Sequence, residues 1–363
     1  MPTLTTFNAN NFFLRYKFSN SYPGSNARQD SSEASEVISG FLPGTAFGNY
    51  TKNYIIWDSS RRKLAEKALK EPDNKLPDIL CFQEVENIQA IRTLNQRYLN
   101  NHYKHSMLID AYDPRNIDVG ILSVYPIVNI RSNIDSFDNN KRLFSRDCLE
   151  VEIDIPGNKN LTLFINHFKS KLVKRDQGST NAQYNSKLRA SHGRRLNQAQ
   201  EVLNIIKKRF QGQHDTALYA VIGDFNDTPY SPYIKPLINS TLLVDVLGQL
   251  RPNDCWTYYW RSKGKVSQID YLLASKALFT KIQAQQIPHI ERKGIGYRSL
   301  NRSGQILPKT AQYVFFEKDP VTPNSNGAAP ANQRVNFRFN RYTAVKRNWK
   351  DNISDHCPVK FWF

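Results

Sequence analysis

Short apolar runs recur along the whole chain, and longer polar or amphipathic stretches separate them. Each run is four to six residues long. Runs of this length predict buried β-strands, because the helices of globular proteins need longer periodic segments. The predicted strands are residues 4–7, 78–82, 118–123, 148–153, 161–165, 218–222, 268–273 and 359–363.

Three of the intervening segments place apolar residues three and four positions apart, the spacing of one helical face. The first holds Trp57, Leu64 and Ala68, the second Ile88, Ile91, Asn95 and Tyr98, and the third Leu196, Ala199, Leu203 and Ile206. The pair Arg194–Arg195 stands at the head of the third segment, where it either solvates the helix or contacts phosphate. Strands that alternate with helices indicate an α/β or α+β fold.

Two long segments fit no compact element. Residues 19–46 are rich in Ser, Asn and Gly, and residues 287–345 carry many Pro, Gly, Asn and Arg. Because no internal repeat or linker separates two cores, we expect a single domain over residues 1–363 with long insertions at about 19–46 and 287–345. The stretch 334–350 interleaves bases with aromatics, which is typical of single-stranded nucleic-acid binders or of a charged edge strand. We favour binding slightly.

Polar side chains follow the predicted strands. In "VIGDFNDTP", residues 221–229, Asp224 and Asn226 end an apolar run, which predicts either a turn or a site. Six strand boundaries carry such polar side chains. In chain order they are Asn8 and Asn10; Gln83, Glu84 and Glu86; Asn166, His167 and Lys169; Asp224 and Asn226; Asp270; and Asp355 and His356. Six such boundaries indicate one site assembled from strand ends.

The balance of charge changes the list of expected partners. Fifty Lys and Arg against 32 Asp and Glu give a net charge of +18. Such a surface attracts polyanions: nucleic acid, anionic membrane or phosphorylated small molecules. The chain has no run of 18 apolar residues, so we expect no transmembrane segment, and no signal peptide is visible, which leaves the localisation open. Four cysteines in a chain of this length do not make a disulfide framework.

The residue types at the strand ends point to hydrolysis of a phosphoester. Carboxylates and amides are hard oxygen ligands that suit Mg²⁺ or Ca²⁺. One histidine can deprotonate water while a carboxylate orients it, and the other can stabilise charge at phosphorus. Zinc fits less well, because the chain has no His-x-x-x-His pair.

Seven motifs carry a resemblance to a known family. In chain order these are "TFNANNFF", "LCFQEVEN", "IDVGIL", "INHFKSK", "GDFNDTP", "QIDYLL" and "SDHCPV", spanning residues 5–359. Together they resemble the endonuclease/exonuclease/phosphatase superfamily, the group of pancreatic-type deoxyribonuclease. "NHFKSK" followed by "RRLNQAQ" is similar to its bacterial nuclease branch, many of whose members are secreted. The resemblance implies a four-layer sandwich in which helices flank two packed β-sheets, with the site at one edge.

The resemblance also implies roles for the residues at the strand ends. Asn8 and Glu84 would be metal ligands, with Asp355 close by, and Mg²⁺ would be the ion, with Mn²⁺ or Ca²⁺ as alternatives. His356 would be the general base, oriented by Asp270. The pair from the "GDFN" motif, Asp224 and Asn226, would contact the scissile phosphate and the nucleophile.

A second group would contact the substrate phosphates. His167 would bind a phosphate oxygen, and Asp110 is the candidate for its partner. Arg115 and Asp118, in "DPRNIDVG", would contact phosphate or support those that do. Asn166 and Lys169, beside the histidine, are the remaining predicted substrate contacts.

Three functions remain open on the sequence. The first is a Mg²⁺-dependent nuclease acting on nucleic acid, DNA foremost, by in-line attack of water. The second is a phosphatase or phospholipase-C-like enzyme acting on inositol phosphates, phosphoinositides or sphingomyelin. The third is a binding module without catalysis, which we disfavour because every motif keeps its acid, amide or histidine.

Overall fold

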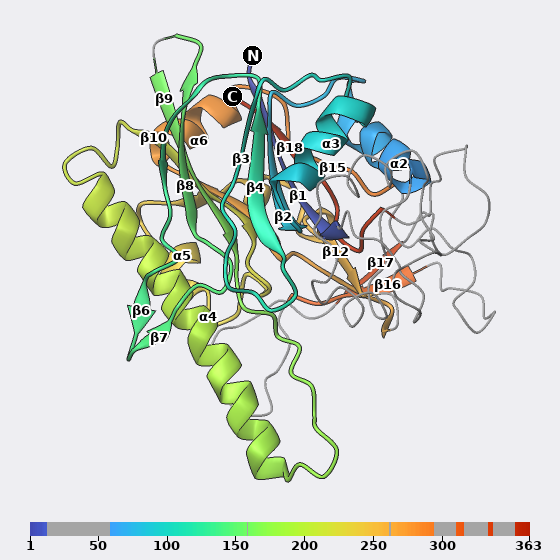
Figure 1. Ribbon diagram of the computed structural model, residues 1–363, viewed down its shortest axis with the longest axis vertical. Helices are drawn as coiled ribbons and strands as arrows, with labels where there is room; N and C mark the ends of the chain where they lie inside the picture. The colour runs from blue at the N-terminus through green and yellow to red at the C-terminus, as the bar shows by residue number, and fades with distance from the viewer. Residues whose placement is uncertain (13–58, 158, 261–262, 294–309, 316–332, 337–352) are drawn as a thin grey trace, which may run out of the picture.

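Two six-stranded sheets form the centre of the protein (Figure 1). The computed structural model describes residues 1–12, 59–157, 159–260, 263–293, 310–315, 333–336 and 353–363. The first sheet has the order β15 (His289–Ile290), β18 (Val359–Trp362), β1 (Thr3–Phe12), β2 (Ile79–Val85), β4 (Asp118–Ser123), β3 (His105–Leu108). The second has the order β11 (Val244–Asp245), β14 (Asp270–Ala274), β10 (Leu218–Asp224), β9 (Lys159–His167), β8 (Leu149–Ile155), β5 (Ile127–Arg131).

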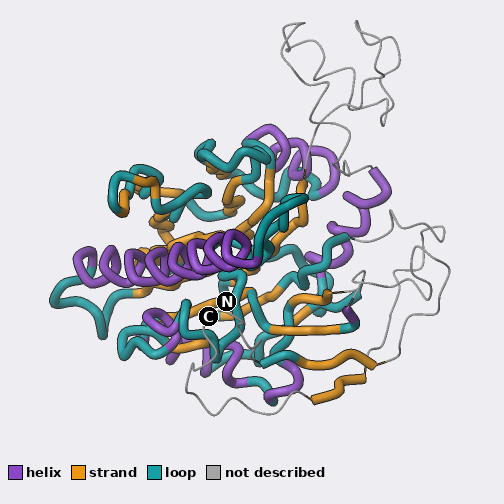
Figure 2. Tube along the Cα trace, turned by 90° about the horizontal axis from the view of Figure 1, so that it is seen from below, coloured by secondary structure: helices purple, strands orange, loops and turns teal. Residues whose placement is uncertain are grey.

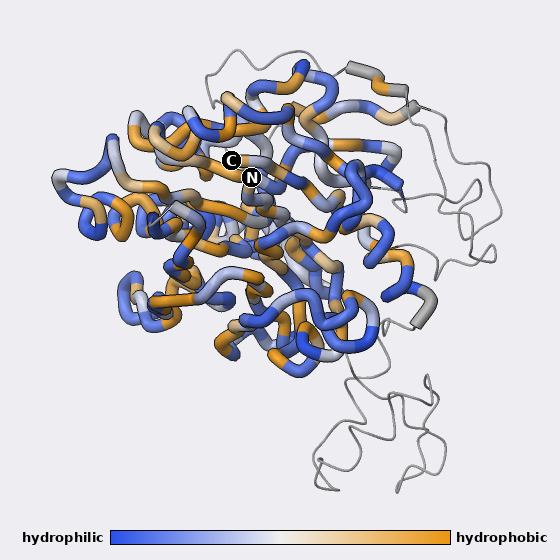
Figure 3. Tube along the Cα trace, turned by 90° about the horizontal axis from the view of Figure 1, so that it is seen from above, coloured by the Kyte–Doolittle hydropathy of each residue, from blue (hydrophilic) through white to orange (hydrophobic). Residues whose placement is uncertain are grey.

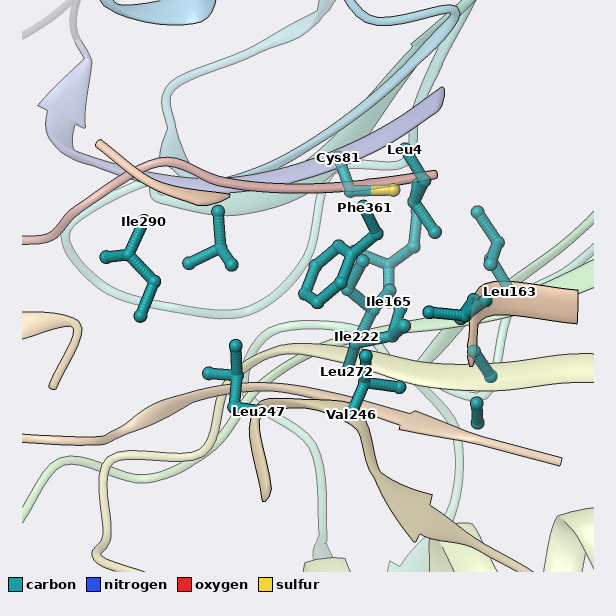
Figure 4. Close-up of a cluster of buried hydrophobic side chains, with 14 of the residues drawn as sticks. Leu4, Cys81, Leu163, Ile165, Ile222, Val246, Leu247, Leu272, Ile290 and Phe361 are labelled. Carbon is teal, nitrogen blue, oxygen red and sulfur yellow. The ribbon is translucent and has the colours of Figure 1, made fainter. Parts of the chain in front are cut away.

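The main core lies between the two sheets. Figure 4 shows Leu4, Cys81 and Phe361 of the first sheet facing side chains of the second. Those facing side chains include Ile165 and Ile222, both fully buried. The apolar alternation of the strands on each side produces this contact, because every second residue points to the same face.

Helices cover the outer face of each sheet, so the expected four-layer sandwich is confirmed (Figure 2). Helices α2 (Ser59–Lys70) and α3 (Ile88–Tyr98) pack on the first sheet. Helices α4 (Asn181–Arg209) and α5 (Lys235–Ile238) pack on the second. A shorter helix, α6 (Lys276–Gln283), adds Leu278 and Ile282 to the main core.

Helix α4 differs from its prediction. It begins at Asn181, where Thr180 and Gln183 form a capping box, well before the predicted start. Leu196, predicted on the apolar face, is 37% exposed, whereas Arg195 is fully buried. The apolar spacing identified the helix but misplaced its buried face, because the partners of that face include polar groups.

All eight predicted strands are present, several of them extended by a few residues into the polar boundary. The sequence did not reveal a four-stranded sheet of β12 (Tyr258–Trp260), β13 (Lys265–Ser267), β16 (Thr310–Tyr313) and β17 (Gln333–Asn336). It also missed the hairpin of β6 (Phe137–Asp138) and β7 (Lys141–Arg142). Strands of two to four residues are too short to show alternation.

The two predicted insertions are only partly described. Residues 19–46 lie outside the described residues, as does Trp57. Within 287–345, the described residues include β15, β16 and β17, so this segment is not wholly loop. Strand β17 lies at the edge of its sheet, as one of the two readings of 334–350 predicted, and residues 337–350 lie outside the described part.

Apolar residues lie mainly inside the layers and hydrophilic ones outside (Figure 3). All four cysteines are free and buried. Among the described residues, none of the helices combines the length and the apolar character needed to cross a membrane.

Candidate active site

The predicted site residues meet where the central strands of both sheets end. In the second sheet, the last residue of β10, Asp224, is in register with His167 on one side and Asp270 on the other. In the first sheet, Asn8 of β1 is in register with Gln83 of β2, next to Glu84. These strands lie in different sheets, so the site joins the two sheets at one edge (Figure 1).

Asp270 and His356 form a buried hydrogen-bonded pair. The Nδ1 atom of His356 lies 2.9 Å from Oδ2 and 3.1 Å from Oδ1 of Asp270. The hydroxyl of Thr257 donates to the same Oδ2 at 2.7 Å, and it accepts from the backbone N–H groups of Ile269 and Asp270. Because Thr257 is fully engaged, the carboxylate is held in one orientation and leaves Nε2 of the imidazole facing the site.

Asp224 is the centre of the constellation. Its Oδ2 accepts from Nδ2 of Asn8 at 2.9 Å and from Nδ2 of Asn226 at 3.1 Å. The same oxygen lies 3.5 Å from Nε2 of His167 and 3.9 Å from Nε2 of His356. The Asp224 side chain therefore connects both histidines to both amides.

Glu84 and Asp355 lie on the first-sheet side and are linked through β1. The Nδ2 atom of Asn10 donates to Asp355 at 2.7 Å, and the backbone N–H of Asn11 donates to Glu84 at 3.0 Å. The register of β1 and β2 shifts between Asn8 and Phe12, which marks a bulge. Glu84 has a φ of 60°, a left-handed conformation that costs a glutamate about 1–3 kcal/mol. Bulges of this kind re-aim side chains, here toward the site.

The electrostatics of the site depend on burial and on crowded carboxylates. Burial raises the pKa of Asp224 to about 7, and Asp270 and Glu84 add to this effect against the opposing charge of His356. Burial lowers the pKa of His356, but Asp270, Asp224 and Asp355 outweigh it and raise this pKa to about 10. Without a cation, the site holds its protons tightly.

A cation fits this surplus of negative charge. Burial raises the pKa of the Tyr258 phenol, and four carboxylates raise it further, in the order Asp355, Asp224, Glu84, Asp270. In addition, the buried Oδ1 of Asn11 accepts no hydrogen bond from any described residue. Hard oxygens with a net negative charge are the ligands that Mg²⁺, Mn²⁺ and Ca²⁺ prefer.

Two sets of residues could hold that cation. Asp224, Asp270 and His356 offer ligand atoms within 4.8 Å of one another. However, both oxygens of Asp270 lie against Nδ1 of His356, so this group already functions as a hydrogen-bonded unit. Glu84 accepts a hydrogen bond through Oε2, and its Oε1 lies 3.7 Å from Nε2 of His167, while Asp355 accepts through Oδ1 from Asn10. Neither carboxylate has both oxygens against one imidazole nitrogen, which makes these two the better candidates.

A basic rim lies beside His167. Arg146 is buried and pairs with Asp113 at 2.8 Å, and its Nη1 donates to the carbonyl of Phe168 at 2.9 Å. Arg115 approaches the other oxygen of Asp113 at 3.3 Å. Burial lowers the pKa of His167 well below its usual range, and Arg146 and Arg115 are the next largest causes. His167 is therefore neutral at physiological pH and can donate one N–H.

Sequence reasoning missed Arg146 and Asp113. Both belong to polar stretches, "DPRN" and "SRDC", that are typical of solvated loops. The only sequence signal was the repeated pairing of Arg with Asp in two stretches, which does not reveal that they meet. Lys169, which was predicted, is half-buried, and burial followed by the charge of Arg146 lowers its pKa.

The structure does not place three predicted contacts as expected. Asp110 is exposed, and Nδ1 of His167 has no hydrogen-bond partner among the described residues, so Asp110 is not the partner of His167. Asn166 turns away from the site because side chains alternate along β9, and it donates to the carbonyl of Phe164 at 3.0 Å. Asp118 is buried behind the site, where it accepts from the backbone N–H of Ala111, and burial raises its pKa to about 7.

A buried ion pair supports the loop after β10. Asp227 contacts Nε of Arg195 at 3.0 Å and Nζ of Lys171 at 2.7 Å. The buried guanidinium of Arg195 comes from α4, so the helix is tied directly to the segment that carries Asn226. This answers the choice left open for Arg195: it neither solvates the helix nor faces the site.

Comparisons with known proteins find similar chains among solved structures. A search of curated proteins finds no match, whereas 154 chains of solved structures match. A Staphylococcus aureus beta toxin mutant with bound magnesium ions is 16% identical, covering 99% of this chain and 98% of its own, with a TM-score of 0.47. A Bacteroides thetaiotaomicron mannosyl-6-phosphatase is 12% identical over 100% and 99%, with a TM-score of 0.48. The human Nocturnin catalytic domain is 15% identical over 84% and 87%, with a TM-score of 0.47.

The match of a family model extends over the whole constellation. The model of the "Endonuclease/Exonuclease/phosphatase family" matches residues 5–356, from within β1 to the histidine that pairs with Asp270. The aligned region therefore contains each strand end that contributes to the site. On this match, the chain belongs to the endonuclease/exonuclease/phosphatase family of metal-dependent phosphoester hydrolases.

Proposed function

We propose that the protein is a Mg²⁺-dependent nuclease that hydrolyses phosphodiester bonds in nucleic acid, with DNA as the first candidate. One observation carries the proposal: the Asp270–His356 pair faces Asp224 at a strand edge whose rim bears Arg115 and Arg146. A base, a buried carboxylate and guanidinium groups within one edge suit in-line attack of water on a phosphodiester.

His356 is the general base in this proposal. Asp270 accepts from Nδ1–H, so that loss of the other proton leaves a lone pair on Nε2. Because nearby carboxylates raise the pKa of His356 to about 10, a cation that offsets their charge would be needed to free this lone pair for a proton from water. The gap of 3.9 Å between Nε2 and the Oδ2 of Asp224 is too long for a direct hydrogen bond. A water that contacts both atoms would be oriented by Asp224 and deprotonated by His356.

His167 binds and stabilises the phosphate, while Asn8 and Asn226 hold Asp224 in place. The two amides fix the orientation of Asp224, and Asn226 donates as well to the carbonyl of Phe168 at 3.1 Å. Neutral His167 donates its N–H to a non-bridging oxygen, and Arg146 adds positive charge beside it. Donors held in place before the reaction stabilise the charge that develops at phosphorus.

The cation would be held by Glu84 and Asp355, with Asn8 as a neutral neighbour. Mg²⁺ binds one or two carboxylates and keeps several waters, which fits this small acidic set, and Mn²⁺ or Ca²⁺ could replace it. When bound, the ion supplies Lewis-acid stabilisation of the phosphoryl oxygens and the leaving group.

The charge of the chain favours a polymeric substrate. A net charge of +18 greatly exceeds what a small phosphomonoester requires, whereas a polynucleotide presents many phosphates to a basic surface. Lys169 and Arg115 are the residues that we expect to contact those phosphates.

A substrate panel tests the proposal. Supercoiled plasmid DNA, single-stranded DNA, RNA, inositol phosphates and sphingomyelin would each be incubated with the protein and Mg²⁺. We expect cleavage of nucleic acid that EDTA abolishes. Hydrolysis of inositol phosphates or sphingomyelin without cleavage of any nucleic acid would refute the nuclease proposal and favour the phosphatase or phospholipase-C-like activity.

A further inference from the structure

Two exposed aromatic rings and one arginine form a surface cluster outside the site described above. Tyr112 and Phe137 are 54% and 56% exposed. The guanidinium carbon of Arg142 lies 3.8 Å from the ring centroid of Tyr112 and 5.4 Å from that of Phe137. The same guanidinium donates to the hydroxyl of Tyr112 at 3.2 Å. We refer to Tyr112, Phe137 and Arg142 as the aromatic platform.

The platform is held rigidly. Phe137 and Arg142 face each other across the β6–β7 hairpin, whose turn residues Asn139 and Asn140 have φ values of 47° and 60°. Two left-handed residues make the tight turn that matches the twist of a hairpin. The hairpin lies beside α4 (Figure 1), and Asp138 accepts from Nδ2 of Asn197 in that helix at 2.5 Å. A preorganised surface loses little entropy when it binds.

The platform continues the basic rim of the site. Tyr112 directly precedes Asp113, which pairs with both Arg115 and Arg146. The backbone N–H of Tyr112 donates to the carbonyl of Ser145, so Tyr112 is held next to the segment that contains Arg146. The exposed rings therefore lie next to the segment that carries Asp113 and its two arginine partners.

We propose that the aromatic platform stacks an unpaired nucleobase of the strand that is cleaved, so that the protein favours single-stranded over fully paired nucleic acid. This inference rests on the proposed nuclease function. Every base has a π-face, and single-strand binders combine such rings with arginine and a basic groove. A base inside a duplex offers no free face to Tyr112 or Phe137.

A membrane surface is the competing partner for exposed aromatic side chains. Insertion into a bilayer requires apolar residues at the leading tip. Here the tip of the hairpin is Asn139 and Asn140, followed by the exposed Lys141, and all three are polar. The rings of Tyr112 and Phe137 lie against the guanidinium of Arg142 behind this tip. This arrangement suits a stacked base.

The test measures binding rather than turnover. In a His356→Ala background, which prevents cleavage, fluorescence anisotropy would compare a short single-stranded DNA with an abasic sugar–phosphate oligomer of the same length. We expect Phe137→Ala and Tyr112→Ala each to raise the Kd for the DNA about 5- to 100-fold and the Kd for the abasic oligomer less than about twofold. Phe137→Trp should restore tight binding, and Phe137→Leu should not.

Controls separate stacking from general surface effects. Val128→Ala removes another exposed apolar side chain, 52% exposed on β5, and should change neither Kd. An equal rise in Kd for both oligomers, or an unchanged Kd in both platform variants, would refute the stacking proposal and leave the nuclease proposal standing. Vesicles of phosphatidylserine and phosphatidylcholine that bind only when Phe137 is present, with an unchanged Kd for DNA, would also refute the stacking proposal. A parent protein that binds neither oligomer would refute the nuclease proposal and the platform with it.

Discussion

Asp270→Asn removes one charge from the buried pair while keeping its size. In the native protein, Thr257 donates to Oδ2, and its own oxygen already accepts two backbone N–H groups. An amide nitrogen placed at Oδ2 would face a donor, so the amide nitrogen takes the other position, 3.1 Å from Nδ1 of His356. The amide N–H then competes with the retained oxygen, 2.9 Å from Nδ1, and wherever it donates to Nδ1 the imidazole proton moves to Nε2.

The consequence is a base in the wrong tautomer. An Nε2 that carries a proton cannot accept one from water. The same change in the Ser-His-Asp triad lowers kcat about 10⁴-fold for this reason, so we expect a loss of about 10³- to 10⁴-fold here. This corresponds to about 4–5 kcal/mol of transition-state stabilisation.

The assay is the initial rate of Mg²⁺-dependent DNA cleavage from pH 6 to pH 9.5, with thermal unfolding as a check on the fold. The matched control is Asp245→Asn, because Asp245 is also a half-buried carboxylate of the second sheet and accepts from Gln268 at 2.9 Å. We expect the control to cleave normally and Asp270→Asn to remain slow at every pH. A loss below about tenfold, or full recovery at high pH, would show that Asp270 only tunes the imidazole pKa and would refute the tautomer argument.

Three further predictions follow from other parts of the structure. Gly223→Ala should prevent folding, because its Cβ would lie 2.1 Å from the carbonyl oxygen of Asn166 at a φ of +127°, whereas Gly248→Ala, with open space, should leave the melting temperature unchanged. Burial raises the pKa of Asp245 to about 6, so the native state binds a proton more readily than the unfolded chain does and loses stability as pH rises from about 4 to 6. Asp245→Asn should therefore raise the free energy of unfolding by about 1–3 kcal/mol above pH 6 and by little near pH 4, as measured by urea denaturation, and equal effects at both pH values would contradict this. Arg115→Ala should reduce the slope of log Kd for DNA against log salt by about 1, whereas Lys104→Ala, just before β3, should not.

The sequence predicted the main sheets and the acidic part of the site well. Strand ends such as those at Asp224 and His167 follow apolar runs that are long enough to recognise, and the family resemblance supplied their common location. Neighbouring strands then bring such ends together automatically, since register places Asp224 beside both His167 and Asp270.

The supporting residues could not be predicted, because their roles arise only in three dimensions. Arg195 looked like part of a solvated helix end, yet it is buried against Asp227 from a distant loop. Asn166 was expected in the site because it precedes His167, but alternation along the strand turns it away. The left-handed conformation that aims Glu84 at the site likewise has no signal in the sequence.

Cleavage of supercoiled plasmid DNA tests the central claim most directly. Purified protein would be incubated with plasmid and Mg²⁺, in parallel with an EDTA control and with the folded variants His356→Ala and His167→Ala. We predict nicking by the native protein only, with both variants reduced by orders of magnitude. Nicking that persists in His356→Ala or in EDTA would contradict a metal-dependent site built on these strand ends.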